Sequence, residues 1–182
     1  MFPDGMKSIY ARGKKMSNRV TYILAGGQLS LPFLKEQLNR HSDRTIIAAD
    51  RGLEACVSLG IEPDFVIGDF DSLDETVREE FLSQEKNVTK LNPIKDDTDT
   101  EAALTLAFEK TEGDIIILGG TGTRLDHVLG NIGILGQGFA HGRSVELLDE
   151  HNRIRLADGP VTIKKREQYG KYVSLLPLTT EV

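Results

Sequence analysis

Two aspartates, Asp69 and Asp71, follow a short apolar run, Phe65–Ile67, that predicts a buried strand. Gly68 lets the backbone turn where this strand ends. In an extended chain, side chains at positions i and i+2 project to the same side, so the two carboxylates are expected to lie next to each other. Like charges repel unless a cation lies between them. The spacing therefore indicates a site for a divalent cation such as Mg²⁺.

A second acidic turn follows downstream, with Asp96, Asp97 and Asp99 around Thr98. One alternative is that this turn only caps the next helix, since Thr98 stands three residues before Glu101. A cap needs one acceptor, whereas this turn offers three carboxylates. We therefore expect at least one of them to bind a ligand. A divalent cation shared by the two acidic turns is the simplest reason for the chain to bring them together.

Three further loops combine glycine with polar residues at the ends of expected strands: Gly26–Gly27, Asp50–Gly52 and Gly119–Thr123. Free backbone amides at the start of a helix favour anions such as phosphate, and Arg124 could contact the same group. Gly119–Thr123 matches neither the P-loop nor the dinucleotide fingerprint, so a tight strand-to-helix connection is an equal alternative. The shared position carries more weight, because open α/β sheets bind ligands at the carboxyl ends of their strands.

The elements that position these loops alternate between strands and helices along most of the chain. This alternation predicts an α/β fold with a doubly wound, mostly parallel sheet and helices on both faces. Apolar residues from Leu125 to Phe139 recur at helical spacing and predict one helix. We expect strands at 20–25, 45–49, 65–67, 88–91, 114–118 and 145–148, and the other helices at 32–40, up to 59, 74–83 and 99–110.

The pattern changes near residues 149–152, so residues 19–149 are expected to form an α/β domain that carries the candidate nucleotide- and metal-binding loops. Short runs at 153–156, 161–164 and 172–176 then predict the start of a small antiparallel β domain, with too few strands by 182 to close it. Residues 1–18 lack an apolar segment. We expect them to be a disordered extension or residues added to the natural chain, with Met16 as a candidate start.

Composition favours a soluble globular protein, with 182 residues, 39% hydrophobic residues and 18 glycines. The net charge of −6 argues against a general nucleic-acid or anionic-membrane surface, and we expect neither partner. A phosphorylated ligand remains compatible, because a bound metal reverses the local sign. The single cysteine, Cys56, is expected to be a buried structural thiol, and it favours a reducing compartment, so we expect a cytoplasmic protein.

Four motifs, in order, resemble those of thiamine pyrophosphokinases: Ala49–Gly52, Pro63–Ser72, Asp96–Asp99 and Gly119–His127. The resemblance covers the chain from about Val20 to its end. It implies an α/β catalytic domain, a C-terminal β-sandwich and a homodimer. The implied reaction moves a diphosphate unit from ATP to the hydroxyl group of thiamine, giving thiamine diphosphate and AMP, with Mg²⁺ as cofactor.

The resemblance also implies roles for particular residues. The catalytic aspartates are Asp69, Asp71, Asp96 and Asp99, of which Asp69, Asp71 and Asp99 are expected to bind the metal. The nucleotide is expected to contact Gly26, Gly27, Asp50, Gly52, Gly119, Gly120, Thr121 and Arg124, and substrate binding falls on Thr98, Arg124 and Asp126. The family's β domain continues beyond the Leu175–Leu178 segment, and the resemblance implies further thiamine contacts from that part of the domain.

Two other functions remain open. A phosphatase with an aspartyl nucleophile would use Asp69 as the nucleophile and Asp71 as the acid. This motif would then lie on the third strand rather than the first, and no later lysine and acidic pair stand in convincing places. A non-catalytic nucleotide-binding module would need the glycine loops but not two acidic turns.

Overall fold

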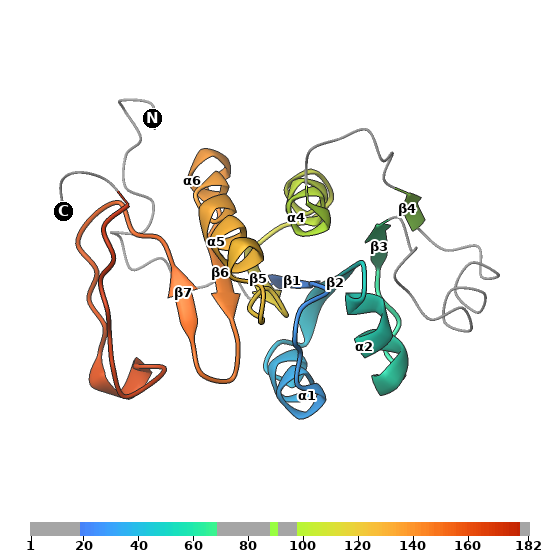
Figure 1. Cartoon of the computed structure of the whole chain (residues 1–182), viewed down its shortest axis with the longest axis horizontal. Coiled ribbons are helices and arrows are strands. Elements are labelled where there is room, and N and C mark those ends of the chain that lie inside the picture. Colours follow the sequence, from blue (N-terminus) through green and yellow to red (C-terminus); the bar gives the residue numbers. More distant parts are fainter. Residues whose placement is uncertain (1–18, 69–87, 91–97, 179–182) are drawn as a thin grey trace.

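The structure is a computed structural model, and it describes residues 19–68, 88–90 and 98–178 (Figure 1). Asp69, Asp71 and Asp96 lie outside the described residues, as does the helix predicted at 74–83.

The described residues form a seven-stranded sheet in the order β4-β3-β2-β1-β5-β6-β7. The strands from β1 to β6 are parallel to their neighbours, and β7 pairs antiparallel with β6. The predicted mostly parallel α/β sheet is thus confirmed. Its strands are β1 (Arg19–Leu24), β2 (Asp43–Ala49), β3 (Phe65–Gly68), β4 (Val88–Lys90), β5 (Asp114–Leu118), β6 (Val145–Leu148) and β7 (Arg153–Arg155).

Helices cover both faces of this sheet (Figure 1). On one face lie α1 (Leu31–Asn39) and α2 (Gly52–Leu59), and on the other lie α4 (Asp99–Lys110), α5 (Leu125–Ile134) and α6 (Gln137–His141). Each face of the sheet has its own hydrophobic core, and successive residues of β1 point into opposite cores. Leu24 packs with α1 and α2, and Ile23 packs with α4. Both residues are fully buried, as expected for a strand covered on both sides.

The helix boundaries follow local capping signals. Gly60 ends α2 in the left-handed conformation with φ 62°, which glycine adopts without strain. The hydroxyl of Thr98 accepts a hydrogen bond from the amide of Glu101 at 3.2 Å, so Thr98 caps α4. The bounds of α4 are those predicted, and Cys56 is fully buried as expected.

The region predicted as one helix after Leu125 differs from that prediction. It forms two helices, α5 and α6, which are separated by Leu135 and Gly136. The side chains of Leu125 and Leu129 are 68% and 59% exposed, whereas Asn131 is buried. The face of α5 that packs against the sheet therefore includes the polar Asn131 beside the partly buried Ile132, while two leucines lie on the exposed face.

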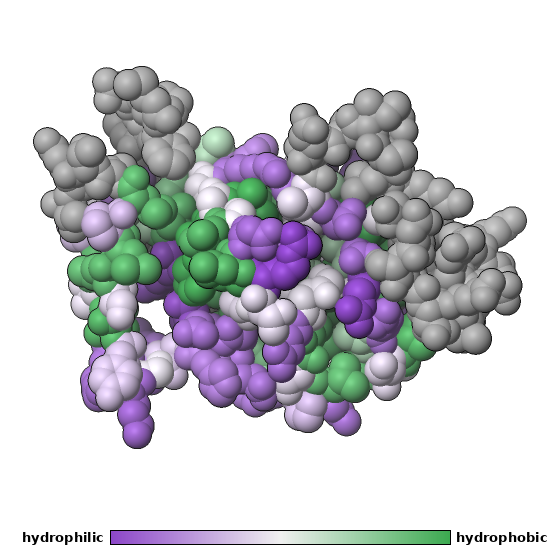
Figure 2. Space-filling view, in the orientation of Figure 1, coloured by the Kyte–Doolittle hydropathy of each residue, from purple (hydrophilic) through white to green (hydrophobic). Residues whose placement is uncertain are grey.

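The chain after β6 also departs from the predicted pattern. The first predicted run becomes β7 and joins the α/β sheet. The runs at 161–164 and 172–176 form no strands in the described part of the chain, and Lys165–Glu167 is a 3₁₀ turn. Apolar surface lies along this segment and beside α5 (Figure 2). The β-sandwich stays a prediction.

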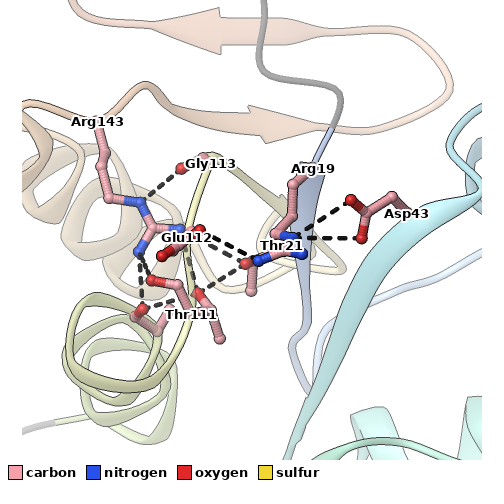
Figure 3. A network of polar contacts seen from close by, with 8 residues as sticks. Arg19, Thr21, Asp43, Thr111, Glu112, Gly113 and Arg143 are labelled. Carbon is pink, nitrogen blue, oxygen red and sulfur yellow. Dashed lines mark hydrogen bonds and ion pairs between the residues drawn. The ribbon is translucent and has the colours of Figure 1, made fainter.

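Arg143 joins several elements toward the amino ends of the strands (Figure 3). Its guanidinium donates to the carbonyl groups of Ala107 at 2.7 Å and Thr111 at 3.0 Å, and also to that of Gly113. The hydroxyl of Thr111 accepts from Arg143 at 3.1 Å and is hydrogen-bonded to Thr21 of β1 at 2.7 Å. This network fixes the end of α4 against β1 and β5, at the edge opposite the candidate site.

Candidate functional site

The site is centred where β1 and β5 end side by side. The chain leaves these two strands in opposite directions across the sheet, which makes this edge the topological switch point. The amide of Gly27 donates to the carbonyl oxygen of Gly119 at 2.9 Å. A Cβ atom on Gly27 would lie 2.3 Å from that oxygen, so only glycine lets the two loops approach this closely.

A cavity of about 1120 Å³ opens over this junction. Its volume slightly exceeds the range of roughly 300–1,000 Å³ common for one small ligand, so two small molecules can be accommodated. It extends along α2 on one side and along α4 and α5 on the other. The predicted site residues that line it are Gly26, Gly27, Asp50, Thr98, Asp99, Gly119, Gly120, Thr121 and Arg124.

Asp50 holds its position through an unusual backbone conformation. Its φ is +48°, in the left-handed region that non-glycine residues rarely adopt. Its amide donates to the carbonyl of Ile67 at 2.9 Å, and its own carbonyl accepts from Leu53 at 3.1 Å. A Cβ atom on Gly26 would lie 2.9 Å from the Oδ2 atom of Asp50. A locally strained residue that presents a carboxylate to a cavity is typical of a functional site.

Two predicted site residues, Gly52 and Asp126, do not line the cavity in the part of the chain that the structure describes. A Cβ atom on Gly52 would lie 1.8 Å from the carbonyl oxygen of Leu24, so close packing of α2 on β1 explains this glycine. Its predicted nucleotide contact remains a prediction.

The second acidic turn reaches the cavity through the start of α4. Thr98 uses its hydroxyl to cap the helix, as the capping alternative expected, and Asp99 follows as the first helical residue. Among the described residues no group of three or more His, Cys, Asp or Glu side chains could hold a metal ion. The predicted metal ligands Asp69 and Asp71 lie outside those residues.

Arg124 and Asp126 form an ion pair at the mouth of the cavity. Their Nη2 and Oδ2 atoms lie 2.6 Å apart, and both side chains are exposed. The hydrogen bond from Arg124 lowers the pKa of Asp126, and the same bond raises the pKa of Arg124. Asp126 therefore orients a guanidinium that lines the cavity, where it can bind a phosphate oxygen.

Two residues behind the glycine loop were not expected from the sequence. The side-chain amide of Asn131, on α5, donates to the carbonyl of Gly120 at 2.7 Å. Asp149, just after β6, accepts hydrogen bonds from the backbone amides of His151 at 2.7 Å and Asn152 at 2.6 Å. Burial raises the pKa of Asp149, but hydrogen bonds from Asn152, His151 and Thr121 outweigh burial and lower it overall.

A sequence signal for Asn131 was present. It lies on the same helical face as Val128 and Leu135, three residues after the first and four before the second. A polar side chain within an otherwise apolar face has to find a hydrogen-bond partner when that face is buried. For Asp149 the sequence shows only an acidic residue at the end of a strand.

Comparison with known proteins gives consistent matches. The family model described as the catalytic domain of thiamin pyrophosphokinase matches residues 36–147. The thiamine pyrophosphokinase of Bacillus subtilis (strain 168) is 34% identical over 162 residues, which cover 88% of this chain and 74% of that protein.

Solved structures agree with this match. The crystal structure of thiamine pyrophosphokinase from Bacillus subtilis aligns with a TM-score of 0.65 at 32% identity, over 75% of this chain and 63% of that one. Thiamin pyrophosphokinase from Geobacillus thermodenitrificans aligns with a TM-score of 0.62 at 32% identity, over 74% and 61%. This chain thus spans less than two thirds of both solved relatives. Among the described helices, none has the length and apolar character needed to cross a membrane.

Proposed function

The chain belongs to the thiamine pyrophosphokinase family, and we propose that it transfers a diphosphate unit from ATP to the hydroxyl group of thiamine. The products are thiamine diphosphate and AMP. The relatives named above support the substrates, because their names state this activity.

The observation that carries the proposal is the large cavity at the switch point of the sheet. Glycine loops supply backbone amides, Arg124 supplies a cation, and Asp50 and Asp99 supply carboxylates around one space. Amides and a guanidinium bind phosphate oxygens, and carboxylates bind cations. This set of groups suits a nucleoside triphosphate better than an uncharged ligand.

Magnesium prefers carboxylate oxygens as protein ligands, and the described part of the cavity supplies one of the proposed ligands, Asp99. We assign the metal to Asp69, Asp71 and Asp99. When bound, it supplies neutralisation of the negative charge that builds on the phosphate oxygens. Arg124 and the loop amides orient the phosphate chain, and a carboxylate of the acidic turns, Asp96 or Asp99 among them, accepts the proton of the thiamine hydroxyl.

The decisive experiment mixes the purified protein with Mg-ATP and thiamine and identifies the products by anion-exchange chromatography. Equal amounts of AMP and thiamine diphosphate are expected. Release of inorganic phosphate without AMP would indicate an aspartyl phosphatase. Nucleotide binding without any product would indicate a binding module.

A further inference from the structure

We propose that Asn131 is a positioning residue, which orients the peptide between Gly120 and Thr121 so that the Thr121 amide faces the cavity and binds a phosphate oxygen. This inference rests on the proposed function, in that it takes ATP as the ligand. The proposal gives α5 a second role in nucleotide binding, in addition to that of Arg124 and Asp126 at its start.

The first observation is the bond itself. The Nδ2 atom of Asn131 lies 2.7 Å from the carbonyl oxygen of Gly120, and the residue is only 8% exposed. Asn131 also lines the cavity, and its side chain connects α5 to the glycine loop. A buried amide donor at this distance strongly prefers one orientation of the carbonyl group that it binds.

The second observation concerns peptide geometry. The described residues contain no cis peptide bonds. In a trans peptide the carbonyl of one residue and the amide of the next point in opposite directions. The Gly120 carbonyl points at Asn131, so the Thr121 amide points away from Asn131. Thr121 itself lines the cavity. By the same rule, the bond from Gly27 to the Gly119 carbonyl directs the Gly120 amide away from Gly27.

The third observation is that Gly120 is already in close contact with the core, so the loop cannot move closer to the sheet. A Cβ atom on Gly120 would lie 2.4 Å from Cδ1 of Leu147 and 3.2 Å from Cγ2 of Ile117. One side of Gly120 is thus packed on the core. Because Thr121 lines the cavity, its backbone amide, which points away from Asn131, is a group that it can offer to a ligand there.

Removing the Asn131 amide leaves the Gly120 carbonyl without its buried donor. The peptide can then rotate toward water, which turns the Thr121 amide out of position. A hydrogen bond from an amide to a charged phosphate is one of the stronger types, and its loss corresponds to about 10- to 100-fold in affinity.

The test is calorimetric titration of Asn131→Leu, which keeps the approximate size of the side chain and removes the donor. The probes are the β,γ-imido analogue of ATP with Mg²⁺, and adenosine, which lacks phosphate. We expect the analogue to bind about 10-fold more weakly or worse, while adenosine affinity stays within about twofold. The control is Ile134→Ala, because Ile134 lies on the same helix, is partly buried and does not line the cavity.

Asn131→Asp is the second variant, since it keeps shape and polarity but places an acceptor against the carbonyl. It should weaken the analogue at least as much as Asn131→Leu. In turnover assays the KM for ATP should rise at least 10-fold while the KM for thiamine changes less than twofold. Equal losses for the analogue and adenosine, or losses equal to those of Ile134→Ala, would overturn the proposal. A wild-type protein that binds the analogue but makes no thiamine diphosphate would instead refute the proposed function.

Discussion

At the level of single residues, the glycines of the site differ in the room around them. A Cβ atom on Gly122 would meet no atom closer than the Gln28 amide nitrogen at 3.7 Å, whereas one on Gly27 would lie 2.3 Å from a carbonyl oxygen. Gly122→Ala should therefore keep the wild-type Tm and raise the KM for ATP severalfold, because its methyl group takes space next to the phosphates. Gly27→Ala should lower stability by about 1–3 kcal/mol.

Thermal unfolding and steady-state kinetics of both variants check this difference. If Gly122→Ala left the KM for ATP unchanged, the Gly119–Thr123 loop would not contact the nucleotide.

Asp71 is the residue on which the metal assignment depends most. Asp71→Asn should lower turnover by about 10²–10³-fold, because the metal that neutralises transition-state charge loses one of its proposed ligands. In the absence of Mg²⁺ its Tm should equal or exceed that of the wild type, since one of two repelling charges is gone. The matched control is Asp43→Asn, an exposed aspartate at the start of β2. Full activity of Asp71→Asn at saturating Mg²⁺ would remove the assignment.

Asp149 should contribute a pH-dependent part of the stability. Its pKa is lowered in the folded protein, so its stabilising effect is present above the unfolded value of about 3.9 and is lost as pH falls through the folded pKa. The Tm difference between wild type and Asp149→Asn should therefore shrink between pH 6 and pH 3. Parallel Tm curves for the two proteins would show that Asp149 does not titrate in this way.

At the level of secondary-structure elements, α4 and α5 show what the sequence could predict. For α4, the capping residue Thr98 and an apolar helical face agree, and its bounds were predicted correctly. For α5 the helical period was correct, but the single helix predicted from Leu125 to Phe139 is two helices, α5 and α6. Burial depends on which side the neighbouring elements cover, and the covered side carries Asn131 rather than Leu125 and Leu129. A hydrophobic pattern alone cannot specify that choice.

Arg143 allows an element-level test of fold against site. Arg143→Met keeps the apolar stem but removes donors to three carbonyl groups, so we expect a loss of about 2–4 kcal/mol of stability. Both KM values should stay unchanged, because the network lies at the opposite edge of the sheet. Arg40→Met, which removes an exposed ion pair with Glu36, is the control and should cost less than about 1 kcal/mol. Chemical denaturation measures both, and a changed KM in Arg143→Met would contradict the separation.

At the level of the whole molecule, the sequence predicted the strands but not their order. Each strand is defined by its own apolar run, whereas the order depends on contacts between distant parts of the chain. The dependence on distant contacts also explains why the segment after β7 was wrongly predicted to form strands. Its apolar runs were predicted as strands, but a strand needs a partner, and Tyr172, Leu175 and Leu176 are more than 80% exposed.

We expect these exposed side chains to mediate association with a second copy of the chain. An apolar surface of this kind on a soluble protein is typical of an interface. Sedimentation velocity at micromolar concentration should show a dimer, and the double variant Leu175→Glu and Leu176→Glu should be monomeric. Leu125→Glu, on the exposed face of α5, is the control and should remain dimeric. A monomeric wild type would exclude this association.

The pairing of β1 with β5 has a consequence for how the protein acquires its cavity. Thr21 of β1 and Thr111, three residues before β5, are hydrogen-bonded to each other and are 90 residues apart in the sequence. The loops Gly26–Gly27 and Gly119–Thr123 come together only when these two strands pair, and closing so long a segment is slow relative to forming a helix or a local turn. Helices can thus form on the nascent chain well before any ligand can bind. The ability to bind nucleotide then reports completion of the central sheet during refolding, not its first collapse.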